Sequence, residues 1–111
     1  MEYEVDCIVY ASGFEITTSM KRRIGIDIVE GRSGYSLYDH WANGFRTLHG
    51  QTTNGFPNQF FMGFIQGGVS VNVTVMYDQQ AHHIAYMVGE TIRRGAKTIE
   101  CSQEAQDSWV K

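Results

Sequence analysis

The pattern of hydrophobic and polar positions predicts two buried strands in the first two thirds of the chain. Residues 5–11 read V-D-C-I-V-Y-A, and residues 59–65 read Q-F-F-M-G-F-I. Continuous apolar runs of this length are typical of strands that are covered on both faces of a parallel or mixed sheet. We therefore predict buried strands at residues 7–11 and 59–65.

A third segment has the period of a strand that is covered on one face. Isoleucines at positions 24, 26 and 28 alternate with other residue types, and G-R-S-G follows at 31–34. Alternation resumes at Tyr35 and Leu37, after these turn residues. Two alternating segments joined by a short turn rich in glycine indicate a β-hairpin, here over residues 24–38.

The pattern changes to a helical repeat after Gly68. Apolar residues at steps of three and four predict a helix over residues 71–94, which is about 36 Å long at 1.5 Å per residue. Ser70 or Asn72 can serve as its N-cap, and Gly95 follows its last turn. A second, shorter helix is predicted after Ser102. The apolar stripe of the long helix comprises Val73, Met76, Tyr77, Ile84, Met87, Val88 and Ile92.

These elements together predict an α/β fold in which residues 1–111 form a single unit. Small residues, Ser12 and Gly13, end the first strand, and the turn Q-G-G-V-S-V-N at 66–72 leads from the second strand into the long helix. Ligands of open α/β sheets bind at the carboxyl ends of the strands. Both turns are therefore candidate binding segments.

Composition and charge exclude several classes of function. The net charge of −3 gives no basic face for nucleic acid. No apolar run approaches the length that spans a membrane. The two cysteines, Cys7 and Cys101, follow no signal peptide and indicate reduced thiols in the cytoplasm. His82 and His83 are adjacent and cannot share a helix face, so we predict no metal site.

Three segments resemble one enzyme family. Residues 6–14 read D-C-I-V-Y-A-S-G-F and resemble the D-x-h-h-x-A-T-G-F stretch, where h is hydrophobic, of class B flavin-dependent monooxygenases, in particular the Baeyer–Villiger type. Residues 41–50 read W-A-N-G-F-R-T-L-H-G and are similar to the family's W-x-x-G-P-R-T-x-x-G. Residues 55–61, G-F-P-N-Q-F-F, are similar to G-F-P-N-L-F-F. Ser12 stands where the family has threonine, and Phe45 where it has proline.

The resemblance implies the carboxy-terminal part of a Rossmann-like, three-layer FAD/NAD(P)-binding domain. The parent enzymes use FAD and NADPH to insert oxygen next to the carbonyl of a small ketone. By resemblance, the cofactor contacts are Ser12, Gly13, Gln66, Gly67, Ser70 and Asn72. Asn72 would place the helix N-terminus toward the flavin ring, although a plain N-cap explains the same residue, and the other positions are also ordinary turn residues. No catalytic residue is assigned to this chain.

The family's glycine motifs and catalytic arginine are expected before Met1. We therefore expect this chain alone to bind neither FAD nor NADPH tightly and to be inactive. The alternative is a stand-alone structural or partner-binding module without redox chemistry. A stand-alone module is expected to replace apolar surface with charge, so the apolar stretch over residues 60–69 favours a fragment that self-associates through an uncovered apolar face. The residues of that face are Phe60, Phe61, Phe64, Ile65 and Val69.

Overall fold

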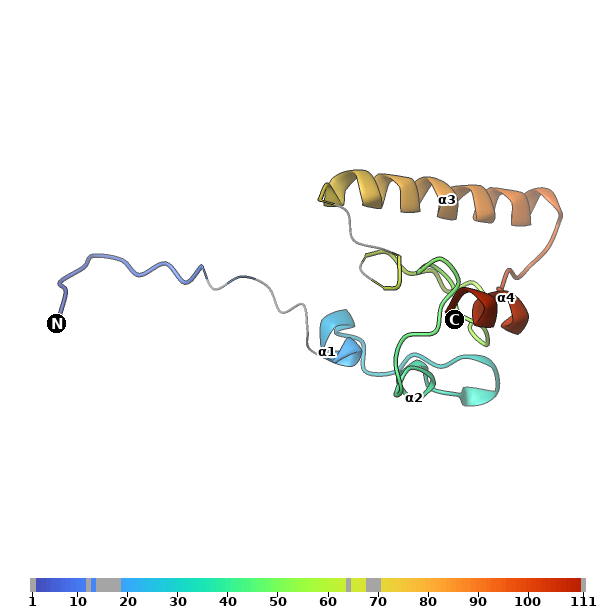
Figure 1. Cartoon of the computed structure of the whole chain (residues 1–111), viewed down its shortest axis with the longest axis horizontal. Coiled ribbons are helices and arrows are strands. Elements are labelled where there is room, and N and C mark those ends of the chain that lie inside the picture. Colours follow the sequence, from blue (N-terminus) through green and yellow to red (C-terminus); the bar gives the residue numbers. More distant parts are fainter. Residues whose placement is uncertain (1, 12, 14–18, 64, 68–70, 111) are drawn as a thin grey trace.

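The computed structural model describes residues 2–11, 13, 19–63, 65–67 and 71–110. In Figure 1, α3 lies along one side of the compact part of the molecule, and α1 and α2 lie on the opposite side. Residues 2–11 form an extended tail that leaves the compact part. The helical elements of the described residues are α1 (Met20–Ile24), η1 (Arg32–Gly34), α2 (Leu37–His40), α3 (Val73–Arg93) and α4 (Gln103–Val110).

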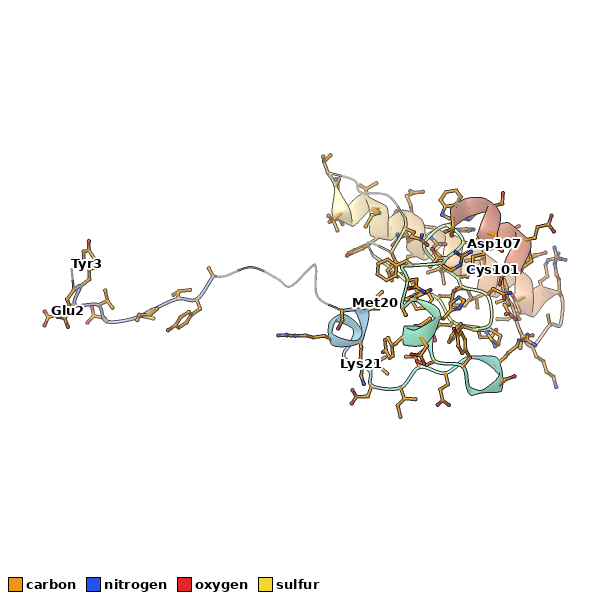
Figure 2. All side chains as sticks on the ribbon, turned by 60° about the horizontal axis from the view of Figure 1, so that its bottom comes forward. Glu2, Tyr3, Met20, Lys21, Cys101 and Asp107 are labelled. Carbon is orange, nitrogen blue, oxygen red and sulfur yellow. The ribbon has the colours of Figure 1, made fainter. Side chains whose placement is uncertain are left out.

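The tail differs from the buried strand predicted at residues 7–11. These residues have no regular secondary structure, and the exposed fractions of Ile8, Val9 and Tyr10 are 66%, 82% and 87%. Figure 2 shows Glu2 and Tyr3 at the far end of the tail, well away from the compact part of the molecule. A buried strand needs a hydrogen-bonding neighbour and cover on both faces. The described residues supply neither here, so the prediction of a buried strand is wrong for this structure.

The second predicted strand is buried but irregular. Phe61 and Ile65 are only 6% and 5% exposed, yet the described residues within 59–65 have no strand conformation. The Phe61 N–H donates to the carbonyl of Gln51 at 2.8 Å. Gly63 then takes φ 110°, which turns the backbone out of an extended path. The prediction of burial is therefore confirmed for Phe61 and Ile65 but not for Met62, which is 49% exposed, and the predicted strand conformation is wrong for the described residues.

A tight turn replaces the predicted hairpin at residues 24–38. Glu30 and Ser36 form an isolated antiparallel bridge around η1. Gly31 packs so closely against the neighbouring turn that an added Cβ would lie 2.3 Å from the carbonyl oxygen of Gly55. This packing fixes the turn without a longer ladder. Among the described residues, the fold is therefore helices and loops with isolated bridges rather than an α/β sheet.

A small aromatic core holds the compact part together. Trp41 lies at its centre, with ring centroids 4.8 Å from Phe61 and 5.3 Å from Phe45. Its indole N–H donates to the carbonyl of Arg46 at 3.1 Å, which satisfies the polar atom of a buried ring. Trp41 therefore anchors the packing of this core. The buried cluster comprises Leu37, Trp41, Phe56, Phe61 and Ile65.

The predicted helices are confirmed. Asn72 caps α3 by accepting a hydrogen bond from the Val75 N–H at 3.1 Å, and Gly95 follows its end with φ 65°. Ser102 caps α4 in the same way, through the Ala105 N–H at 3.2 Å. None of the helices in the described part of the chain has the length and hydropathy to cross a membrane.

The apolar stripe of α3 is only partly covered. The exposed fractions of Val73, Tyr77 and Ile92 are 37%, 38% and 71%, whereas Gln80 within the stripe is buried. The described residues bring loops rather than strands against this face. Part of the stripe faces solvent.

Candidate functional site

Two of the candidate cofactor contacts lie together in a loop beside α3. Gln66 and Gly67 belong to residues 61–67, called here the 61–67 loop, of which residue 64 lies outside the described part. Asn72 caps the nearby start of α3. Gly67 therefore lies against α3 at Gln80, and Asn72 stands at the amino-terminal end of the same helix.

The remaining candidates do not join this group. Gly13 belongs to the exposed tail and has φ 83°, with no atom within 4 Å of an added Cβ. Its positive φ fits the predicted glycine turn. Ser12 and Ser70 lie outside the described residues, so their proposed contacts are not placed.

The 61–67 loop packs without a gap on the turn at residues 48–52. Gly50 takes φ 72°, and a Cβ there would lie 2.1 Å from the carbonyl oxygen of Ile65 and 2.8 Å from the nitrogen of Gly67. Real Cβ atoms do not approach backbone so closely. Only glycine therefore allows the two segments to meet.

The side chain of Gln66 points into the protein. Its Oε1 accepts hydrogen bonds from both the N–H and the hydroxyl of Thr47, each at 2.8 Å. Thr47 is fully buried, and a buried amide needs such a partner. Gln66 itself has φ 52°. A ligand at this loop would therefore meet the backbone of Gln66 rather than its side chain.

Gln80 holds the opposite side of the loop. It is 6% exposed, its Oε1 accepts from the Gly63 N–H at 2.9 Å, and its Nε2 donates to the Gly63 carbonyl at 3.2 Å. The same nitrogen would lie 3.1 Å from a Cβ on Gly67. One side chain of α3 thus pairs with both backbone polar groups of the buried residue Gly63.

Sequence reasoning missed Gln80 and Thr47. The signal for Gln80 was present, because it occupies a position of the α3 stripe between the apolar residues Tyr77 and Ile84. A polar residue in an apolar stripe is buried only where it finds partners. Thr47 carries no comparable signal, since its partner Gln66 is distant in sequence.

The amino terminus of α3 is electrostatically positive. Its first turn contains no acidic residue, and the Asn72 side chain that caps it is uncharged. The first N–H groups of a helix lack intrahelical partners, and the helix dipole adds about half a positive charge there. This end therefore favours a negatively charged or electron-rich group.

An apolar cavity lies between α1, α2, the 61–67 loop and α3. Its volume is about 340 Å³. The lining is mostly hydrophobic, so the cavity suits an apolar group or an apolar side chain of a partner. Lining residues include Met20, Val29, Leu37, Phe61, Gly63 and Tyr77.

The histidines form no metal centre in the described part of the chain, where no cluster of three or more possible ligands occurs. His82 and His83 lie on different faces of α3, as predicted. His82 Nδ1 lies 2.9 Å from the carbonyl oxygen of Asp78, and the ring of His83 lies 5.9 Å from that of His49. Burial, with Arg46 nearby, lowers the pKa of His40.

The chain is similar to known proteins over almost its whole length. No family model matches the chain. It is 41% identical over 112 residues to neopentalenolactone D synthase of Streptomyces avermitilis, covering 99% of this chain and 19% of that protein. It is 44% identical over 110 residues to a Baeyer–Villiger monooxygenase of Streptomyces coelicolor, covering 98% of this chain and 18% of that protein. A crystal structure of OTEMO in complex with FAD and NADP superposes with a TM-score of 0.77 and 32% identity, covering 98% of this chain and 20% of that one.

These similarities identify the chain as part of a flavin-dependent monooxygenase. The chain spans about a fifth of the length of the curated relatives that it matches. Its similarity to them extends over almost all of its own residues. The chain belongs to the Baeyer–Villiger monooxygenase family, and it corresponds to one segment of those enzymes.

Proposed function

We propose that this chain is the carboxy-terminal part of the FAD-binding domain of a Baeyer–Villiger monooxygenase that uses FAD and NADPH. Such an enzyme inserts an oxygen atom between the carbonyl carbon of a ketone and its neighbour, giving an ester or lactone. The observation that carries the proposal is the match of 98% of the chain, at 32% identity, to a structure that holds FAD and NADP. We treat residues 1–111 as one unit of that domain and place the protein in the cytoplasm, where its free Cys7 and Cys101 would stay reduced.

The residues around the start of α3 fit the ring end of a flavin. The helix terminus offers unpaired N–H groups and a positive field, and its first turn holds no acidic side chain that would repel an electron-rich ring. Gly67 would present backbone without a side chain, and Gln66 would present its backbone, because its side-chain Oε1 is paired with Thr47. When bound, FAD would supply the redox and oxygen chemistry; these residues would bind and orient it.

The other proposed contacts involve the tail and the turn before α3. Ser12 and Gly13 would bring backbone close to FAD, and Ser70 would contribute from the same turn as Gln66. These assignments come from the family resemblance and the glycine geometry of Gly13. No catalytic residue is proposed in this chain.

The uncovered apolar surface supports a role within a larger domain. Of the apolar face expected at residues 60–69, Phe61 and Ile65 are buried, Phe60 is half-buried, and Phe64 and Val69 lie outside the described residues. Tail residues Val9 and Tyr10 and the outer face of α3 are exposed instead. We propose that the rest of the enzyme covers both, and that residues 7–11 then pair as a strand of a Rossmann-like sheet. Alone, the chain is expected to self-associate through these surfaces.

A segment exchange tests this function. The matching segment of the Streptomyces coelicolor relative is replaced with this chain, and oxidation of NADPH and formation of lactone from cyclohexanone are measured. We expect turnover that depends on both NADPH and ketone, with the unmodified relative as the positive control. The same relative with its segment deleted is the negative control. A folded exchange protein without either activity contradicts the proposal.

A further inference from the structure

Gln80 is buried on a helix whose other stripe residues are apolar. Only 6% of it is exposed, and it lies against Gly63 and Gly67 of the 61–67 loop. Burying an amide costs free energy unless its hydrogen bonds are replaced. The structure replaces them through the backbone of a single residue, Gly63, whose N–H and C=O make contacts of 2.9 Å and 3.2 Å.

This pair of contacts is specific to a carboxamide. Glutamine carries one acceptor and one donor side by side, which match the N–H and C=O of one residue. Glutamate at neutral pH lacks the donor, and methionine lacks both strong groups. The Gly63 backbone has φ 110°, a conformation with few competing ways to pair its polar groups.

The two sides of the 61–67 loop are held differently. On the core side, Gly50 makes close contact with Ile65 and Gly67, and Thr47 binds Gln66. On the α3 side, Gln80 binds Gly63 and lies against Gly67. Gln80 is therefore the side chain through which α3 sets the distance between its own amino-terminal half and the loop.

We propose that Gln80 is a positioning residue for the flavin. It binds Gly63 and so fixes the backbone of Gln66 and Gly67 relative to the start of α3. Both surfaces would then meet the flavin ring in one fixed geometry. The link to flavin rests on the proposed function. The two hydrogen bonds between Gln80 and Gly63, called here the clamp, are contacts within this chain and do not depend on it.

The clamp is tested on the chain itself by amide hydrogen exchange. Gln80→Met removes both contacts and keeps the shape of the side chain. Protection of the Gly63 amide should fall by about tenfold, as expected for the loss of one net hydrogen bond. Gln79→Met, at the exposed neighbouring position, should leave Gly63 protection unchanged. Unchanged protection in Gln80→Met overturns the proposal.

A measurement on the parent chain decides the case if Gln80→Met does not fold. The side-chain Nε2 protons of Gln80 should exchange slowly with solvent, because one of them is bound to the Gly63 carbonyl. Those of the exposed Gln79 should exchange at the rate of a free amide. Equal rapid exchange at both residues overturns the clamp.

The link to flavin is tested in the segment exchange with the Streptomyces coelicolor relative. Gln80→Met should shift the visible absorption and the reduction potential of the bound FAD, and Gln79→Met should shift neither. Lost Gly63 protection with unchanged spectrum and potential overturns the positioning role and leaves the proposed function standing. If the exchange protein without a substitution folds but takes up no FAD, both the proposed function and the link to flavin are wrong. Hydrogen exchange on the isolated chain still tests the contacts between Gln80 and Gly63.

Discussion

At the scale of single residues, Gly50 is the described glycine at which an added Cβ would lie closest to another atom. A Cβ at this position would lie 2.1 Å from the carbonyl oxygen of Ile65, in a backbone conformation with φ 72°. Gly50→Ala should therefore destabilise the chain by at least about 2 kcal/mol, from overlap and left-handed strain together. Chemical denaturation measures the free energy of unfolding.

Gly34 provides the matched control for Gly50. It has the same φ of 72°, but no atom lies within 4 Å of an added Cβ. Gly34→Ala should therefore show the cost of strain alone and be clearly milder. Equal losses in the two variants would mean that the close approach to Ile65 contributes nothing.

His40 makes stability depend on pH. Burial, with the charge of Arg46 nearby, lowers the pKa of His40 in the folded chain, and its Nε2 lies 3.2 Å from the hydroxyl oxygen of Thr53. The unfolded chain therefore takes up this proton at a higher pH than the folded chain does. Above the ordinary pKa of histidine, the neutral His40 side chain contributes its full share to the stability of the fold. That contribution is lost as the pH falls toward the lowered pKa of the folded chain. His40→Gln should lose less stability than the parent between pH 7.5 and pH 5.5. If His40→Gln loses as much stability as the parent over this range, this account of His40 is wrong.

At the scale of elements, α4 is attached through a buried amide. Gln106 is fully buried, and its Oε1 accepts from the hydroxyl of Thr53 at 3.1 Å and the N–H of Asn54 at 2.8 Å. Gln106→Leu leaves the Asn54 N–H without this acceptor and should cost about 1–3 kcal/mol of stability. Gln103→Leu, exposed on the same helix, should change stability by less than about 0.5 kcal/mol. Similar thermal stability for both variants would contradict this role.

Substitutions of Asn72, at the start of α3, distinguish its role as a helix cap from an electrostatic role beside the flavin. In the segment exchange, Asn72→Asp should keep the cap of Val75 N–H and near-parent thermal stability. Its charge should lower the reduction potential of bound FAD, because a carboxylate disfavours the reduced, anionic flavin. Asn72→Ser keeps a cap without charge and should change the potential less. An unchanged potential in a well-folded Asp variant assigns Asn72 to capping alone.

The same elements show what the sequence could predict. The helical repeat of α3, its Asn72 cap and its glycine end are local properties, so they could be predicted within one or two residues. A buried strand depends on distant partners, and the apolar run at residues 7–11 contains no information on whether they are present. Gln66 was predicted as a ligand contact, but its pairing with Thr47 required the three-dimensional fold.

At the scale of the whole molecule, the shape supports a segment of a larger protein. The chain extends 66 Å along its longest axis against 30 and 27 Å along the others, because the apolar tail leaves the compact part. Figure 1 shows this tail without a neighbouring element. Isolated chain should therefore elute from gel filtration as concentration-dependent oligomers. A monomer at all concentrations would show that the exposed tail and α3 face need no cover.

Flavin content tests the central claim most directly. The segment exchange with the Streptomyces coelicolor relative and the isolated chain are each incubated with FAD and passed through gel filtration, and absorbance in the visible range is recorded. The account predicts that the exchange protein retains FAD and that the chain alone emerges colourless, because the contacts proposed here are to the ring end and the described residues provide no glycine-rich phosphate cradle. A folded exchange protein without flavin, or a chain that stays yellow alone, would contradict the account.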